Sequence, residues 1–100
     1  MPITGPQARA ARILVEWPRD HVARLSGVEA KTLAAFERGK IDPGDTARDA
    51  IQSALESGGA VFIPEDGRQG LGVRLKFTKK DAKQINRMEN EGGPVGDDDV

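Results

Sequence analysis

The chain has 100 residues, of which 37% are hydrophobic and only 4% aromatic, so we expect one small domain with a compact aliphatic core. It contains no cysteine and a single histidine, which excludes a disulfide framework, a cysteine-ligated metal and a multi-histidine metal site within one chain. No apolar run reaches the roughly 20 residues that span a bilayer, and the first residues carry no secretory signal. These features predict a cytoplasmic protein that binds no membrane, metal or cofactor and is not an enzyme.

The formal net charge of −1 conceals a division of the chain into charged blocks. Residues 1–40 carry a net charge of +3 and residues 67–87 a net charge of +6, whereas residues 41–66 and 88–100 each carry −5. A polyanion responds to the field within about 8–10 Å rather than to the total charge. The two basic blocks are therefore compatible with DNA, although ordinary solvated surface explains the charge alone equally well.

Helix-capping residues and apolar spacing predict a first helix that begins near residue 5. Thr4 and Gln7 have the spacing of a capping box, and Trp17-Pro18 is expected to end the helix, because a residue before proline avoids the helical region. The side chains expected to face inward are Ala10, Ala11, Leu14 and Val15, with Arg9 and Arg12 on the outer side.

Three further helices are expected at about residues 18–26, 30–38 and 46–57. The second should bury Val22, Ala23 and Leu25, and Gly27 suits the left-handed residue that closes it. Trp17 is expected in the core and His21 on the exposed side of the second helix. The fourth helix should bury Ala47, Ala50, Ile51, Ala54 and Leu55.

After residue 59 the pattern changes from helix to strand. Residues 60–63 and 72–77 read as a β-hairpin, in which Val73, Leu75 and Phe77 share one face and Arg74 and Lys76 the other. The fold class is therefore mainly α: a bundle of four or five helices followed by a β-hairpin and a disordered tail. The expected divisions are residues 1–59 for the helical domain, 60–77 for the hairpin, 78–91 for a polar helix and 92–100 for an acidic tail.

The most informative stretch runs from Trp17 to Gly39, where two short helices meet across a tight turn that contains Gly27. The residues that carry a family resemblance are Trp17, Val22-Ala23, Gly27-Val28, Thr32-Leu33 and Phe36-Glu37-Arg38-Gly39. With them, the chain resembles the lambda-repressor/Cro-like helix-turn-helix regulators, also called the XRE family. Residues 59–67 and 72–75 resemble an alphaproteobacterial type in which a hairpin follows the helical domain. The resemblance covers residues 3–77.

The resemblance implies a regulator of transcription that binds double-stranded DNA as a homodimer on a palindromic site. Carried over residue by residue, it implies that Glu37 is structural and that the DNA-binding residues are Arg19, Ala30, Lys31, Thr32, Ala34, Ala35, Arg38 and Lys40. Dimerisation is expected through the hairpin residues Val61, Ile63, Val73, Leu75 and Phe77, by strand pairing or by packing of the Val73/Leu75/Phe77 face. A regulator of this kind would be associated with the nucleoid.

Two departures from the family pattern keep other functions open. Pro18 and Glu29 stand where the family usually has Ser or Thr as helix caps, and Ala34 and Ala35 offer no hydrogen bond to a base edge. The alternatives are a protein-interaction module, such as an antiactivator or antitoxin, and a DNA-bending accessory protein with little sequence preference. The acidic end of the chain is expected to fold back onto the basic residues 67–87 and compete with phosphates.

Overall fold

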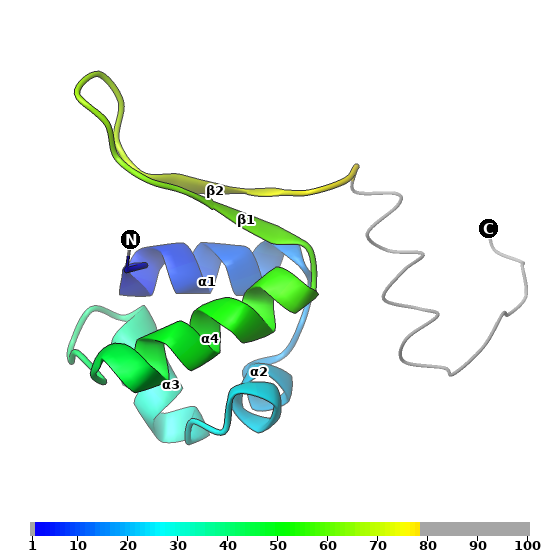
Figure 1. The fold of residues 1–100 in the computed structure, drawn as a ribbon. Helices are drawn as coiled ribbons and strands as arrows, with labels where there is room; N and C mark the ends of the chain where they lie inside the picture. The colour runs from blue at the N-terminus through cyan, green and yellow to red at the C-terminus, as the bar shows by residue number, and fades with distance from the viewer. Residues whose placement is uncertain (1, 79–100) are drawn as a thin grey trace, which may run out of the picture.

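The computed structural model describes residues 2–78, which form four α-helices followed by a two-stranded antiparallel hairpin (Figure 1). A mainly helical fold with a hairpin is thus confirmed. The fifth helix expected at residues 78–91 and the disordered tail at 92–100 lie outside the described residues, apart from Thr78. The elements are α1 (Gly5–Leu14), α2 (Arg19–Ser26), α3 (Ala30–Glu37), α4 (Asp45–Ser57), β1 (Ala60–Ile63) and β2 (Gly72–Leu75).

Helix α1 begins with the expected capping box. The Thr4 Oγ1 accepts a hydrogen bond from the Gln7 backbone N–H at 3.2 Å, and the Gln7 Oε1 accepts one from the Thr4 N–H at 3.0 Å. The helix ends at Leu14, earlier than Trp17-Pro18 suggested, because Glu16 adopts a left-handed backbone conformation with φ 62°. The chain turns there toward α2.

The inward side of α1 differs from the expected one. Ala8, Ala11 and Val15 are fully buried, whereas Leu14 on the flank of that stripe is 38% exposed. Arg12, expected on the outer side, instead packs against the domain with only 14% of its side chain exposed. Polarity alone predicts an exposed guanidinium, but the Glu37 carboxylate from another helix is its partner in the structure.

Helices α2 and α3 are joined by the short turn at residues 27–29, where Gly27 has the left-handed φ of 75°. In α2 Val22 is fully buried and Trp17, just before the helix, is 6% exposed. Leu25 is 51% exposed, contrary to expectation. The side of α2 turned toward the domain runs through Val22, Ala23 and Ser26, and Leu25 falls outside it.

Helix α4 closes the domain against α1 and α2. Ile51, Ala54 and Leu55 are buried as expected, and Ala47 and Ala50 are half-buried. A Cβ at Gly58 would lie 2.7 Å from the Trp17 ring, so the absence of a side chain there lets the indole pack against the end of α4.

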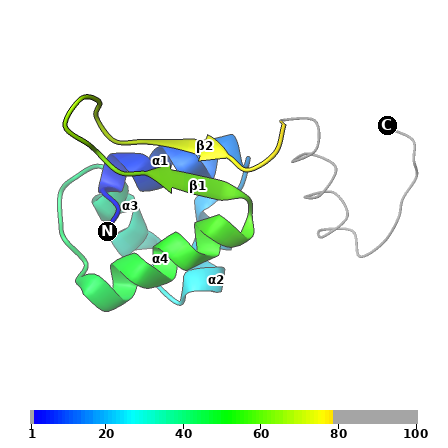
Figure 2. The ribbon, with the colours of Figure 1, turned by 45° about the horizontal axis from the view of Figure 1, so that its top comes forward.

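The hairpin pairs Ala60 with Leu75 and Ile63 with Gly72, and β2 ends two residues before Phe77. Figures 1 and 2 show it lying across α1, with its tip extending beyond the helices. The side chain of Gln7 attaches it to α1, since Nε2 donates to the carbonyl oxygens of Gly72 at 2.8 Å and Ile63 at 3.3 Å.

Among residues 2–78, no helix is long and apolar enough to cross a membrane.

Candidate nucleic-acid interface

Helix α3 presents one buried and one exposed side. Leu33, Phe36 and Glu37 face the domain with 5% or less of each residue exposed. On the other side, Lys31 and Arg38 are exposed, and Ala34 and Ala35 between them are half-buried. These four positions are spaced i, i+3, i+4 and i+7, so they form one stripe along the helix. Ala30 and Thr32 flank this stripe and are half-buried.

The buried carboxylate of Glu37 fixes α3 to the two helices before it. Its two oxygens accept hydrogen bonds from Arg12 Nε at 2.7 Å and Arg12 Nη2 at 3.1 Å. Arg19 donates to Oε1 of the same carboxylate from Nε and Nη2, each at 3.2 Å. Arg12 also donates to the Trp17 carbonyl oxygen at 3.2 Å. Glu37 therefore has a structural role, as expected, and connects α1, α2 and α3.

Arg19 consequently has a partner that the sequence did not reveal. It was expected to contact a DNA phosphate near the start of α2, but its guanidinium is paired with Glu37. With 37% of its side chain exposed, Arg19 still reaches the surface beside α3. Its main contribution in this structure is to hold α2 and α3 together.

Both helices of the turn begin without a side-chain cap. Pro18 has no side-chain donor or acceptor, and Glu29, in an extended conformation at the N-cap of α3, makes no capping hydrogen bond. The Glu29 side chain is exposed, so it brings a negative charge to the end of α3 that carries Lys31. This charge opposes a phosphate at the same place.

The segment after α3 adds Lys40, which is exposed, and a loop that is held to α4. Asp42 and Asp45 both form ion pairs with Arg48. The Gly44 backbone N–H, followed by Arg48, lowers the pKa of the Asp42 carboxyl below its usual value. No acid among residues 2–78 pairs with Lys31, Arg38 or Lys40. The three cations on and directly after α3 are thus available to an external anion.

The five residues expected at a dimer interface fall on two different faces. Val73 and Leu75 pack against the core of their own domain, and the Phe77 ring lies against Gly59. Val61 and Ile63 are on the opposite face of the hairpin, and each is 38% exposed. Of the two dimerisation modes expected, packing through the Val73/Leu75/Phe77 face conflicts with the contacts that face already makes.

No protein-family model matches this sequence, and no curated protein matches it. Within residues 2–78 no group of three or more His, Cys, Asp or Glu side chains is placed to hold a metal ion.

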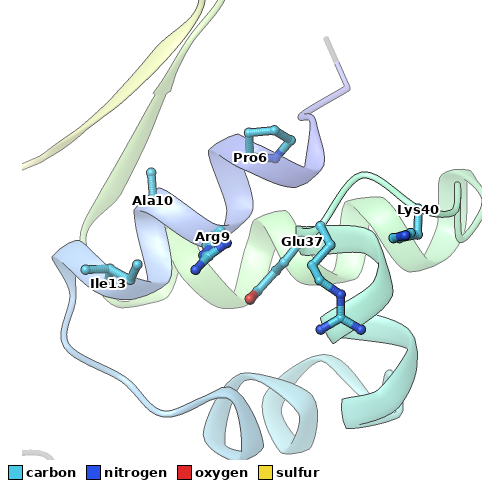
Figure 3. Close-up of a pocket in the computed structure, with 7 residues that line it drawn as sticks. Pro6, Arg9, Ala10, Ile13, Glu37 and Lys40 are labelled. Atoms are coloured by element: carbon cyan, nitrogen blue, oxygen red, sulfur yellow. The ribbon is translucent and has the colours of Figure 1, made fainter.

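Sequence reasoning assigned no role to a groove between α1 and the end of α3, with a volume of about 600 Å³. Figure 3 shows Pro6, Arg9, Ala10 and Ile13 on its α1 side and Glu37 and Lys40 on its α3 side. Pro6, Ala10 and Ile13 repeat at helical spacing on a side of α1 other than the buried one. That second apolar stripe marks the α1 side of the groove in the sequence, but nothing local marks its α3 side.

Proposed function

We propose that this chain is a regulator of transcription that binds double-stranded DNA as a homodimer, as its resemblance to the lambda-repressor/Cro-like helix-turn-helix proteins implies. The observation that carries the proposal is the exposed stripe of α3, with Lys31 at one end and Arg38 at the other. A helix fits the major groove, which is about 12 Å wide. Small residues at Ala34 and Ala35 allow the helix axis to approach the bases closely.

The distribution of positive charge supports the same proposal. Lys31 is positioned to reach a base edge or a phosphate, while Arg38 and Lys40 follow at the far end of α3, where a helix in the groove meets the DNA backbone. A contact between Lys and a guanine edge contributes about 1–3 kcal/mol of discrimination. With one such side chain in the stripe, the proposed specificity depends on two copies reading two half-sites.

The outer face of the hairpin supports a homodimer. Val61 and Ile63 are exposed apolar side chains on this face, and within residues 2–78 each of the two strands has one unpaired edge. Edge-to-edge pairing of two hairpins would satisfy backbone groups at one edge of each sheet, whereas packing of two outer faces would bury these side chains. To bind a palindromic site, such a dimer would have to hold its two α3 helices about 34 Å apart, the distance between successive major grooves.

A binding assay on DNA tests the proposal. The full chain is titrated against DNA from upstream of its own gene and against random DNA, at several salt concentrations. Lys31→Ala and Arg38→Ala should weaken binding to the upstream DNA, and Arg38→Ala should reduce the salt dependence by about one released counterion.

The matched control is Arg68→Ala, which removes the same charge at the hairpin tip, on the opposite side of the molecule from α3 (Figure 1). Equal affinity for both DNAs, together with no effect of Lys31→Ala, would overturn specific regulation. Bending of DNA with equal affinity for all sequences would instead favour the accessory-protein alternative.

A second function, recognition of a protein by the same helix-turn-helix, is favoured by Glu29. Its exposed carboxylate at the start of α3 repels phosphate, and the adjoining alanines suit an apolar protein contact better than a base edge. This function predicts that the chain shifts no DNA at low salt and binds one partner in a stable complex. Loss of that complex on Ala34→Asp, with DNA binding absent throughout, would support it.

A further inference from the structure

The groove between α1 and the end of α3 combines an apolar strip with unpaired positive charge. Its α1 side carries Pro6, Ala10 and Ile13, and Ile13 is 57% exposed, more than any other large hydrophobic side chain among residues 2–78. Arg9, Arg38 and Lys40 surround this strip and are all exposed. No acid among the described residues pairs with any of these three cations.

The acid within the groove does not neutralise these cations. Glu37 lines the groove in Figure 3, but its two oxygens already accept hydrogen bonds from Arg12 and Arg19. Its negative charge is balanced by those two guanidinium groups. A partner in the groove therefore meets three positive side chains beside an exposed apolar surface, which suits an acidic segment that also carries aliphatic side chains.

We propose that the acidic end of this same chain, residues 88–100, docks in the groove and competes with DNA for Arg38 and Lys40. This segment carries five acidic residues and no basic one; Met88 precedes the acids and Val95 lies among them. The charges of segment and groove are complementary, and either aliphatic side chain suits the strip formed by Ala10 and Ile13. The competition with DNA rests on the proposed function, whereas the docking itself does not.

The chain is long enough for this contact. The described part ends at Thr78, and the longest dimension of the structure is 42 Å. Val95 is the seventeenth residue after Thr78, and an extended chain of that length reaches about 55–60 Å. An extended segment can therefore reach the groove from any point at which the chain leaves the hairpin, whereas the helix expected at residues 78–91 would shorten this reach to about 33 Å.

The groove is a better target than the described part of the basic residues 67–87, onto which the acidic end is expected from the sequence to fold. Arg74 and Lys76 are exposed on the hairpin, but Val61 beside them on that face belongs to the surface proposed for dimerisation. In the groove, three cations and an apolar strip belong to one recess. Docking there would also place carboxylates where the proposed DNA backbone contacts lie.

The docking is tested on the full chain by amide and methyl chemical shifts, without DNA. The variant Asp97→Asn/Asp98→Asn/Asp99→Asn is compared with the unaltered chain at low and high salt. Docking predicts that shifts of Arg9, Ile13, Arg38 and Lys40 change in the variant and at high salt, while those of α4 stay constant. Changes confined to Arg74 and Lys76, or no changes at all, would overturn the proposal.

DNA affinity is then measured for the same variant. Competition predicts binding about threefold to tenfold tighter than for the unaltered chain at low salt, with the difference lost at high salt. The control variant Asp49→Asn/Glu56→Gln/Glu65→Gln raises the net charge equally, through exposed acids far from the segment in sequence. An equal gain in both variants would overturn the competition. Shifts that report docking in a chain that binds no DNA would refute the proposed function and leave the docking standing.

Discussion

Arg12 and Glu37, which are 25 residues apart in the sequence, form a two-pronged ion pair between α1 and the last residue of α3. The carboxylate side chain is 1% exposed and the guanidinium 14% exposed. Because Arg19 joins the same carboxylate from α2, one acid sets the positions of three helices. The exposed stripe of α3 depends on this cluster for its orientation.

Removing Glu37 should destabilise the protein strongly. Glu37→Ala leaves the guanidinium of Arg12 largely buried without its partner, and breaking a buried pair in this way costs about 3–5 kcal/mol. Arg19→Ala should cost much less, since that side chain is more than a third exposed and solvent compensates for the lost pair. Unfolding in urea measures both free energies.

The replacement Arg12→Met/Glu37→Leu provides the comparison. An apolar pair removes both charges, and such exchanges are often close to neutral. We expect the double variant to be more stable than Glu37→Ala. A double variant as unstable as the single one would show that the cost comes from packing rather than from an unpaired charge.

Gly5 should tolerate no side chain. A Cβ at this position would lie 1.8 Å from the Phe36 carbonyl oxygen, a backbone atom that cannot rotate away. Gly5→Ala must therefore separate α1 from α3, at a cost of about 1–3 kcal/mol or more. The control is Gly67→Ala, where a Cβ meets nothing within 4 Å, and thermal unfolding should find that variant unchanged. Equal melting temperatures for both would contradict the close approach of α1 to α3.

Replacing the uncapped Glu29 should improve both stability and DNA binding. Glu29→Ser supplies a side-chain acceptor for the first backbone N–H groups of α3, which is worth about 0.5–2 kcal/mol. It also removes a negative charge from the proposed interface. Glu29→Gln removes the charge without supplying a short cap, so it separates the two effects. If neither variant binds DNA more tightly at low salt, the carboxylate does not face the phosphates.

The sequence predicted the parts of this fold that depend on local chemistry. The Thr4/Gln7 capping box, the left-handed turn at Gly27 and the two strands of the hairpin follow from neighbouring residues, and the structure confirms each. It did not reveal that Arg12 and Arg19 would meet Glu37, because those partners are brought together by the packing of three helices. Polarity alone assigned Arg12 to the outside and Leu25 to the inside, and both assignments were wrong.

In the candidate site, too, features of a single element can be predicted from the sequence, whereas features that depend on packing between elements cannot. The stripe of Lys31, Ala34, Ala35 and Arg38 can be read from helical spacing, since it depends on one helix only. The two faces of the hairpin could also be separated by alternation, which put Val73 and Leu75 together. Which face meets the core is decided by how the hairpin lies on α1, and no local pattern encodes that choice. The groove could not be predicted from the sequence, because it forms only where α1 packs beside the end of α3.

Acid should loosen the hairpin tip. The backbone N–H groups of Arg68, and next Gln69, donate to the Asp66 carboxylate and lower its pKa below 3.8. A carboxyl whose pKa is lower in the folded state contributes stability above its unfolded pKa and loses it as pH falls through the folded value. The tip should therefore be stable above about pH 4 and loosen below it. Amide shifts of Arg68 and Gln69 during an acid titration measure this, and Asp66→Ala should abolish the response.

Gln7 should control the attachment of the hairpin to α1. It is 2% exposed, and its amide group donates to the carbonyl oxygens of Ile63 and Gly72 while accepting from the Thr4 N–H. Gln7→Glu keeps the acceptor for Thr4 but replaces the donor by a carboxylate that repels both carbonyls. Leaving buried polar groups unpaired costs about 1–3 kcal/mol, so hydrogen exchange of the strand amides should accelerate more than that of α4.

The control is Thr4→Ala, which removes the cap of α1 but leaves the hydrogen bonds from Gln7 to the two carbonyls in place. This variant should leave the hydrogen-exchange rates of the strand amides unchanged. If Gln7→Glu and Thr4→Ala affect the strand amides equally, the capping box, and not the link to the carbonyls, holds the hairpin in place.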